Sequence, residues 1–127
     1  SPPDMRLPIQ YALFWPDRQP SVARQFDWAE AYYLEFYPPD PERHTALELG
    51  LEVAVRGGTA GAVLNGANEA AVAAFLEGKI PFTEIVPLCR AVLEHHPFDP
   101  SPSLDILLRL DRWARQEVQR WVCSKTV

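Results

Sequence analysis

The distribution of proline decides where this chain can form long helices. Eight of the 13 prolines stand before residue 42, none lies between residues 42 and 80, and the other five lie between residues 81 and 102. Proline lacks an amide hydrogen, and its ring obstructs the preceding helical turn. The spacing therefore predicts a connecting arm over residues 1–41 and a helical domain over residues 42–127.

The arm carries two short predicted elements. Residues 9–15 are expected to form a helix that Pro16 ends. Residues 32–37 alternate with the period of a β-strand, and two prolines close that segment. A lone strand needs a partner for its main-chain groups, and the rest of the chain offers none. We expect this edge strand to pair outside the chain or across a dimer.

The helical domain carries four predicted amphipathic helices. They cover residues 42–56, 59–77 and 84–96, and the last follows a capping serine at 103. Glycines at positions 57, 58 and 78 are expected to end the first two helices. The alanines of the second helix allow close helix contact. The expected fold class is mainly α, a four-helix bundle preceded by a proline-rich arm with one short helix and one short strand.

Composition argues against several functions. The formal charge is −5, with 17 acidic and 12 basic side chains and no cluster of cations, so we expect no nucleic-acid partner. No apolar run is long enough for a membrane span.

Cys89 and Cys123 are too few for a disulfide framework and favour a reducing compartment. His95 and His96 diverge on a helix, and His44 is distant, so we expect a solvated helix end and no metal site.

Three polar side chains are predicted on helix faces that are otherwise apolar. Asp111 and Arg115 stand four residues apart in the apolar stripe of the last helix and can pair. A helical projection places Asn68 on the inward face of the second helix. Buried polar groups bond to one another, so we predict a structural polar lock of Asn68, Asp111 and Arg115. A catalytic role is the alternative.

The stretch from Asn65 to Glu69 contains residues that weaken a helix interior. Asn and Gly favour helix ends and turns, so we expect the second helix to restart here. Asn65 or Asn68 would cap the new segment, with Glu69 near its positive end. The alternative is that the freed amides bind an anion. Gly57-Gly58-Thr59 is interpreted as a turn, because no lysine follows it as in a phosphate-binding loop.

Two long motifs resemble one family. Residues 3–18 read Pro-Asp-Met-Arg-Leu-Pro-Ile-Gln-Tyr-Ala-Leu-Phe-Trp-Pro-Asp-Arg, and residues 62–69 read Ala-Val-Leu-Asn-Gly-Ala-Asn-Glu. With residues 74–85, they resemble the C-terminal third of 1-deoxy-D-xylulose 5-phosphate reductoisomerase. Residues 34–40 and 111–115 resemble it in order and spacing. The usual motif is Leu-Asn-Ala-Ala-Asn-Glu, from which Gly66 departs, and Leu7 replaces a usually smaller residue.

The resemblance implies an enzyme of non-mevalonate isoprenoid biosynthesis. Such an enzyme converts deoxyxylulose phosphate to 2-C-methyl-D-erythritol 4-phosphate with NADPH and Mg²⁺ or Mn²⁺. Its nucleotide-binding domain, metal-binding carboxylates and phosphate-binding residues precede residue 3 of this chain. We therefore expect a fragment that holds no catalytic residue and binds neither cofactor nor metal by itself. The resemblance places the enzyme in the bacterial cytoplasm, or in the plastid of a plant or alga.

The resemblance also implies partners and a pocket. Pro3 and Met5 would lie on a loop beside the substrate and nicotinamide, where they supply apolar lining. The partners would be the enzyme's own N-terminal and catalytic domains, and the strand of the arm would contribute to a homodimer. We expect the helical domain to act as a structural buttress of the active site. The rival hypothesis is a free-standing helical adaptor that binds a protein through its strand and tryptophans.

Overall fold

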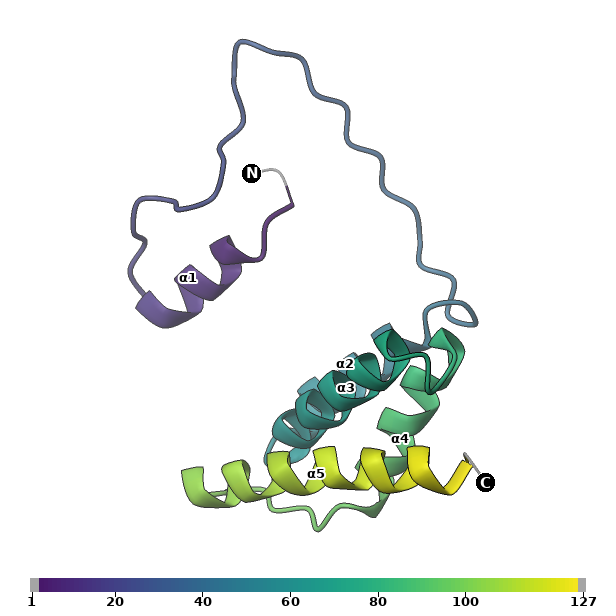
Figure 1. The fold of residues 1–127 in the computed structure, drawn as a ribbon. Coiled ribbons are helices and arrows are strands. Elements are labelled where there is room, and N and C mark those ends of the chain that lie inside the picture. The colour runs from purple at the N-terminus through teal and green to yellow at the C-terminus, as the bar shows by residue number, and fades with distance from the viewer. Residues whose placement is uncertain (1–2, 126–127) are drawn as a thin grey trace. The chain divides into compact units, whose positions relative to one another are not determined.

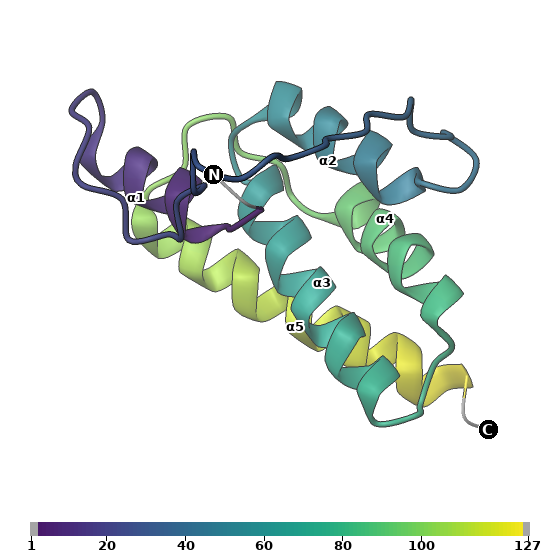
Figure 2. The ribbon, with the colours of Figure 1, turned by 90° about the horizontal axis from the view of Figure 1, so that it is seen from above.

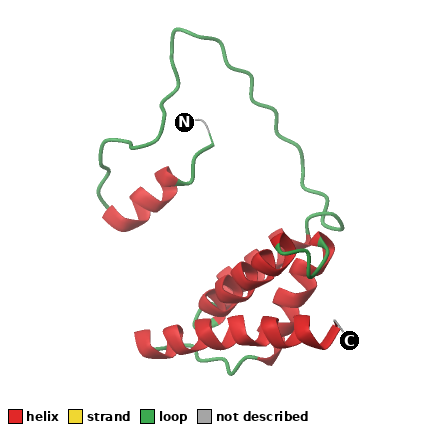
Figure 3. Cartoon of the chain, viewed as in Figure 1, coloured by secondary structure: helices red, strands yellow, loops and turns green. Residues whose placement is uncertain are grey.

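The structure, a computed structural model, describes residues 3–125 (Figure 1). The chain divides into two units, one extending up to Tyr37 and the other beginning at Pro38. Every regular element in the described residues is helical (Figure 3), and the fold is mainly α as expected. The N-terminal segment (residues 3–37) and the helical unit (residues 38–125) are described separately below.

The N-terminal segment contains one helix, α1 (Arg6–Phe14), which begins three residues before its predicted start. None of its side chains is buried. The predicted strand over residues 32–37 is absent from the described residues, where the main chain forms no ladder. The reason is physical: a strand forms only when a neighbour accepts its hydrogen bonds, and residues 3–125 supply no such neighbour. Tyr33 and Phe36 are 92% and 88% exposed.

The helical unit contains four α-helices in its described residues. They are α2 (Thr45–Arg56), α3 (Ala60–Leu76), α4 (Ile85–His95) and α5 (Leu104–Lys125), with the short 3₁₀ helix η1 (Phe82–Glu84) before α4. The predicted ranges agree with these bounds apart from the first helix, which begins three residues later, at Thr45. Asp40 accepts hydrogen bonds from the main chain of Glu42 and Arg43, and this turn delays the helix.

The core lies around α3, which contacts α2, α4 and α5. Its most extensive contact is with α5, and Figure 2 shows the two helices crossing. Ala60, Ala67 and Ala71 are fully buried on this helix, which confirms that its alanines allow close contact. Aliphatic side chains of α4 and α5 complete the core: Leu88, Val92, Leu93, Leu110, Val118 and Val122.

Glycine and serine end and begin these helices as the sequence predicts. Gly57 follows α2 with a φ of 65°, and its amide donates to the Val53 carbonyl. Gly78 follows α3 with a φ of 72°. Its amide donates to the Phe75 carbonyl, and the amide of the next residue donates to the Ala74 carbonyl. This pair of hydrogen bonds ends many helices at a left-handed glycine. The Ser103 hydroxyl accepts from the Ile106 amide at the start of α5.

The predicted restart within α3 is wrong. The helix runs unbroken from Ala60 to Leu76, so neither Asn65 nor Asn68 caps a segment and Glu69 lies at no helix end. Packing explains Gly66: a Cβ added there would lie 2.8 Å from both the main-chain oxygen and Oδ1 of Asp111. The glycine lets α5 approach α3 closely, and this contact outweighs its low helix propensity.

Candidate functional site

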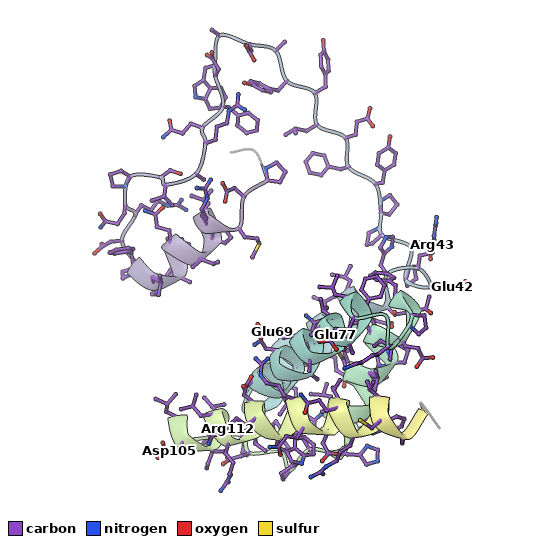
Figure 4. All side chains as sticks on the ribbon, viewed as in Figure 1. Glu42, Arg43, Glu69, Glu77, Asp105 and Arg112 are labelled. Carbon is purple, nitrogen blue, oxygen red and sulfur yellow. The ribbon has the colours of Figure 1, made fainter. Side chains whose placement is uncertain are left out.

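A cluster of charged side chains joins α3 to α5. The Arg115 guanidinium donates from Nε to Asp111 Oδ2 at 3.0 Å and from Nη2 to Glu69 Oε2 at 2.6 Å. The side chains of Asp111 and Arg115 are 29% and 36% exposed, so the cluster lies at the edge of the helix contact. Its two carboxylates raise the pKa of Arg115 above its usual range, with Asp111 the larger cause. Figure 4 labels Glu69 on α3 and Arg112, a neighbour of Asp111 on α5.

Asn68 is not a member of this cluster. Its side chain is exposed, and within the described residues it forms no hydrogen bond, so the prediction that it points inward is wrong. Asn68 instead lines a cleft of about 330 Å³ between α2, α3 and α4, together with Asn65. Because α3 is apolar on nearly every side, its periodicity did not show which face meets the core. Glu69, which was expected near a helix end, is instead the third member of the charged cluster with Asp111 and Arg115.

Replacing Asp111 with alanine tests how much the charged cluster contributes to stability. Because the pair is partly exposed, we expect Asp111→Ala to lower the free energy of unfolding by about 1 kcal/mol, the size typical of a charged contact near the surface. Arg112→Ala, an exposed neighbour on α5, is the control and is expected to change it by less than about 0.5 kcal/mol. Urea unfolding measures both. Equal changes in the free energy of unfolding for the two substitutions would show that the charged cluster does not stabilise the fold.

The turn before α3 holds a buried threonine that bonds to a distant segment of the helical unit. Thr59 is fully buried, and its hydroxyl accepts the Asp99 amide at 3.0 Å. The Thr59 amide donates in return to the Asp99 carbonyl at 3.0 Å. Gly58 lies beside this pair, because a Cβ there would lie 2.3 Å from the Asp99 carbonyl oxygen. This contact joins residues 40 positions apart and leaves no periodic signal in the sequence.

The two adjacent histidines differ in environment. His95 is exposed at the end of α4 and contacts the Ala91 carbonyl at 2.7 Å. His96 is buried, which contradicts its expected place at a solvated helix end. Its Nδ1 lies 2.5 Å from the Leu93 carbonyl oxygen, its Nε2 lacks a partner in the described residues, and Phe98 packs edge-on against its ring. The two neighbouring rings point in different directions, so that of His95 faces solvent and that of His96 faces the interior.

Pro3 and Met5 lie just before α1. Both are exposed, Met5 by 72%. Between them Asp4 accepts a hydrogen bond from the Arg6 amide at 2.9 Å and further bonds from the Arg6 guanidinium, the shortest at 2.6 Å. This pair fixes the main chain that carries Pro3 and Met5. The side-chain bond from Arg6 lowers the pKa of Asp4 from its ordinary 3.8 to about 2.

The pKa of Asp4 gives a test of this loop. A carboxyl group with a lowered pKa keeps its charged hydrogen bonds above its ordinary pKa and loses them as the pH falls. We therefore expect the Asp4–Arg6 contact to be complete above pH 3.8 and to open near pH 2. Proton NMR titration of the Asp4 side chain measures this, and Arg6→Ala should return its pKa toward 3.8. An unchanged titration in Arg6→Ala would contradict the pairing.

A metal site and the glycine turn before α3 can both be checked against the geometry of the described residues. They contain no group of three His, Cys, Asp or Glu side chains close enough to hold a metal ion. The turn at Gly57 and Gly58 cannot cradle a phosphate, because the Asp99 segment occupies the space beside Gly58. None of their helices is both long and apolar enough to cross a bilayer. The described residues therefore offer no side-chain cluster that fits the metal ion implied by the resemblance.

Comparison with known proteins identifies the family. The model of the DXP reductoisomerase C-terminal domain matches residues 1–117. The chain belongs to this family. The 1-deoxy-D-xylulose 5-phosphate reductoisomerase of Rhodopirellula baltica is 55% identical over 115 residues, which cover 91% of this chain and 25% of the relative. That of Thermomicrobium roseum is 52% identical over 121 residues, 94% of this chain and 31% of the relative.

Solved structures of the family share the fold. The reductoisomerase of Zymomonas mobilis in complex with NADPH has a TM-score of 0.71 and 39% identity, over 94% of this chain and 32% of that one. A reductoisomerase in complex with magnesium has a TM-score of 0.71 and 30% identity, over 98% of this chain and 33% of that one. The chain thus spans a quarter to a third of the length of the relatives it matches.

Proposed function

We propose that this chain is the C-terminal part of an NADPH-dependent reductoisomerase that converts 1-deoxy-D-xylulose 5-phosphate to 2-C-methyl-D-erythritol 4-phosphate. The observation that carries the proposal is the 55% identity to the reductoisomerase of Rhodopirellula baltica over 91% of this chain. The solved relatives in complex with NADPH and with magnesium support the same cofactors for the longer enzyme. The rival reading, a free-standing adaptor, has no support from these matches.

Within that enzyme, the helical unit is a buttress and the N-terminal segment is its connecting arm. α2 to α5 form a bundle around α3, and the charged cluster of Glu69, Asp111 and Arg115 holds α5 against α3. This cluster replaces the expected lock that included Asn68. The chain's own residues do not hold the metal or the nucleotide, which belong to the preceding domains. The enzyme works in the bacterial cytoplasm or, in a plant or alga, in the plastid.

The arm has two roles in this proposal. Pro3 and Met5 form an apolar wall of the substrate and nicotinamide pocket, and the Asp4–Arg6 contact fixes their main chain. Residues 32–37 pair as a strand across a homodimer. Their exposure supports this, because Tyr33 and Phe36 present large side chains and unpaired main chain to solvent.

Met5→Ala in the longer enzyme tests the pocket wall. Removing apolar lining next to the substrate should lower kcat/KM about tenfold, the equivalent of about 1.4 kcal/mol, by loss of contact with the bound ligands. Leu13→Ala is the control, because Leu13 is also exposed on α1 and the resemblance gives it no pocket role. Steady-state kinetics with deoxyxylulose phosphate and NADPH measure both. An unchanged kcat/KM in Met5→Ala would remove Met5 from the pocket.

A further inference from the structure

A cavity of about 510 Å³ lies between the first half of α5 and the loop that joins α4 to α5. Phe98 and two prolines of the loop line it, together with Ile106, Leu110 and Trp113 of α5. Its volume is in the range of small-molecule sites, which are lined by apolar and aromatic groups with a few polar ones among them. This space is called the α5 cavity below.

The loop side of the α5 cavity is held in place by contacts with the rest of the helical unit. Thr59 and Asp99 are joined by two hydrogen bonds of 3.0 Å each. The His96 ring packs edge-on against the Phe98 ring, and the Arg56 guanidinium lies 4.7 Å from the centroid of that ring. A site whose walls are fixed before binding loses little conformational entropy when a ligand enters. The α5 cavity is therefore preformed.

The α5 cavity presents aromatic surface to a ligand. Phe98 is 39% exposed, and Ile106 and Trp113 are half-buried even though both pack against the core. A rigid aromatic ring fits such a surface better than a flexible chain, because it stacks on the exposed rings and loses little conformational entropy on binding. The lining thus favours a flat, apolar ring system.

Arg109 gives the α5 cavity its charge preference. The guanidinium lies in the lining and forms no ion pair or hydrogen bond within the described residues, although Asp105 stands four residues before it on α5. Asp99 also lines the cavity, but its Oδ1 already accepts the Ser101 amide at 2.9 Å. A guanidinium offers a planar set of donors that matches the oxygens of a carboxylate, sulfonate or phosphate. The unpaired charge in this cavity is therefore positive.

We propose that the α5 cavity binds a small aromatic anion, a flat apolar ring system that carries a carboxylate, sulfonate or phosphate group. The rings lie against Phe98 and Trp113, and the anionic group accepts hydrogen bonds from the Arg109 guanidinium. This site is separate from the proposed enzyme function, because every residue that forms it belongs to the helical unit.

Two fluorescent probes that differ in one charged group test this site in the longer polypeptide. 8-Anilinonaphthalene-1-sulfonate carries an anionic group, and N-phenyl-1-naphthylamine has the same rings without it. Arg109→Gln is compared with Arg112→Gln, which removes an exposed cation of α5 outside the cavity (Figure 4). We expect Arg109→Gln to raise the Kd of the sulfonate about tenfold and to leave the Kd of the neutral probe within about twofold. Arg112→Gln should leave both Kd values within about twofold.

Trp113→Leu tests where the rings bind. Because this substitution removes aromatic contact, we expect it to raise the Kd of both probes about fivefold. Urea unfolding shows whether the variant is folded. Phe98→Leu, which alters the loop side of the cavity, takes its place if Trp113→Leu does not fold.

Each possible result supports or overturns the proposal. Selective weakening of the sulfonate in Arg109→Gln, together with weakening of both probes in Trp113→Leu, supports it. An unchanged Kd of the sulfonate in Arg109→Gln, or an equal loss of both probes there, overturns recognition of the anionic group. No binding of the sulfonate by the unsubstituted polypeptide, or unchanged Kd values in folded Trp113→Leu, overturns the α5 cavity as the site.

Discussion

Gly58→Ala is expected to lower the free energy of unfolding of the helical unit by about 4 kcal/mol. Gly58 has a φ of 55°, a conformation that costs a residue with a Cβ about 1–2 kcal/mol. The added Cβ would also lie 2.3 Å from the Asp99 carbonyl oxygen and 3.0 Å from the Pro100 Cα, and neither main-chain atom can rotate away. Relief requires the Asp99 segment to move off the turn, which breaks its two hydrogen bonds with Thr59.

Gly78→Ala is the matched control for this substitution. Gly78 has a φ of 72°, but a Cβ there would meet open space. We expect Gly78→Ala to reduce stability by only about 1 kcal/mol, the left-handed strain alone. Urea unfolding followed by circular dichroism measures both variants. If the two substitutions destabilise equally, the close approach between Gly58 and the Asp99 segment is not a stabilising feature of the fold.

Gly66→Leu is expected to destabilise the helical unit by about 3 kcal/mol or more. A Cβ at this position already lies 2.8 Å from the Asp111 main-chain oxygen, and the rest of a leucine side chain would separate α3 from α5. Leucine has the better helix propensity by about 0.8 kcal/mol, which offsets only part of this loss. The separation would also disturb the contact of Asp111 with Arg115.

Gly50→Leu isolates the propensity effect. Gly50 lies inside α2, is exposed, and has nothing near its missing Cβ. The same substitution there should stabilise the unit by about 0.5–1 kcal/mol. Thermal unfolding measures both variants, and we expect a lower Tm for Gly66→Leu and a higher Tm for Gly50→Leu. A stabilising Gly66→Leu would mean that α5 does not approach α3 as closely as described.

The helices could be predicted because their signals are local. Proline excludes helix from its own surroundings, glycine ends helices by its access to positive φ, and apolar spacing marks the buried face. Those rules located all four helices of the helical unit to within three residues at each predicted start or end, apart from the η1 turn. Residues 32–37 form no ladder within the described chain, because strand formation depends on a neighbour and no local rule supplies one.

The side chains of the candidate site were harder to predict. Asp111 and Arg115 were paired correctly, because a separation of four residues on one helix fixes their proximity. Their third partner was missed, since Glu69 and Arg115 are separated by 46 residues. The sequence pattern does not place Asn68 correctly, because α3 is apolar around nearly its whole circumference and its periodicity indicates no single core face.

The central claim is that the chemistry of the proposed reductoisomerase is carried by chain outside these helices. Its most direct test is NADPH consumption, followed by absorbance, with deoxyxylulose phosphate and Mg²⁺ present. Circular dichroism first confirms helix content in the 127-residue chain. We expect no consumption by the 127-residue chain at any concentration and turnover by the longer polypeptide. NADPH oxidation that depends on deoxyxylulose phosphate and requires only the 127 residues would contradict the account.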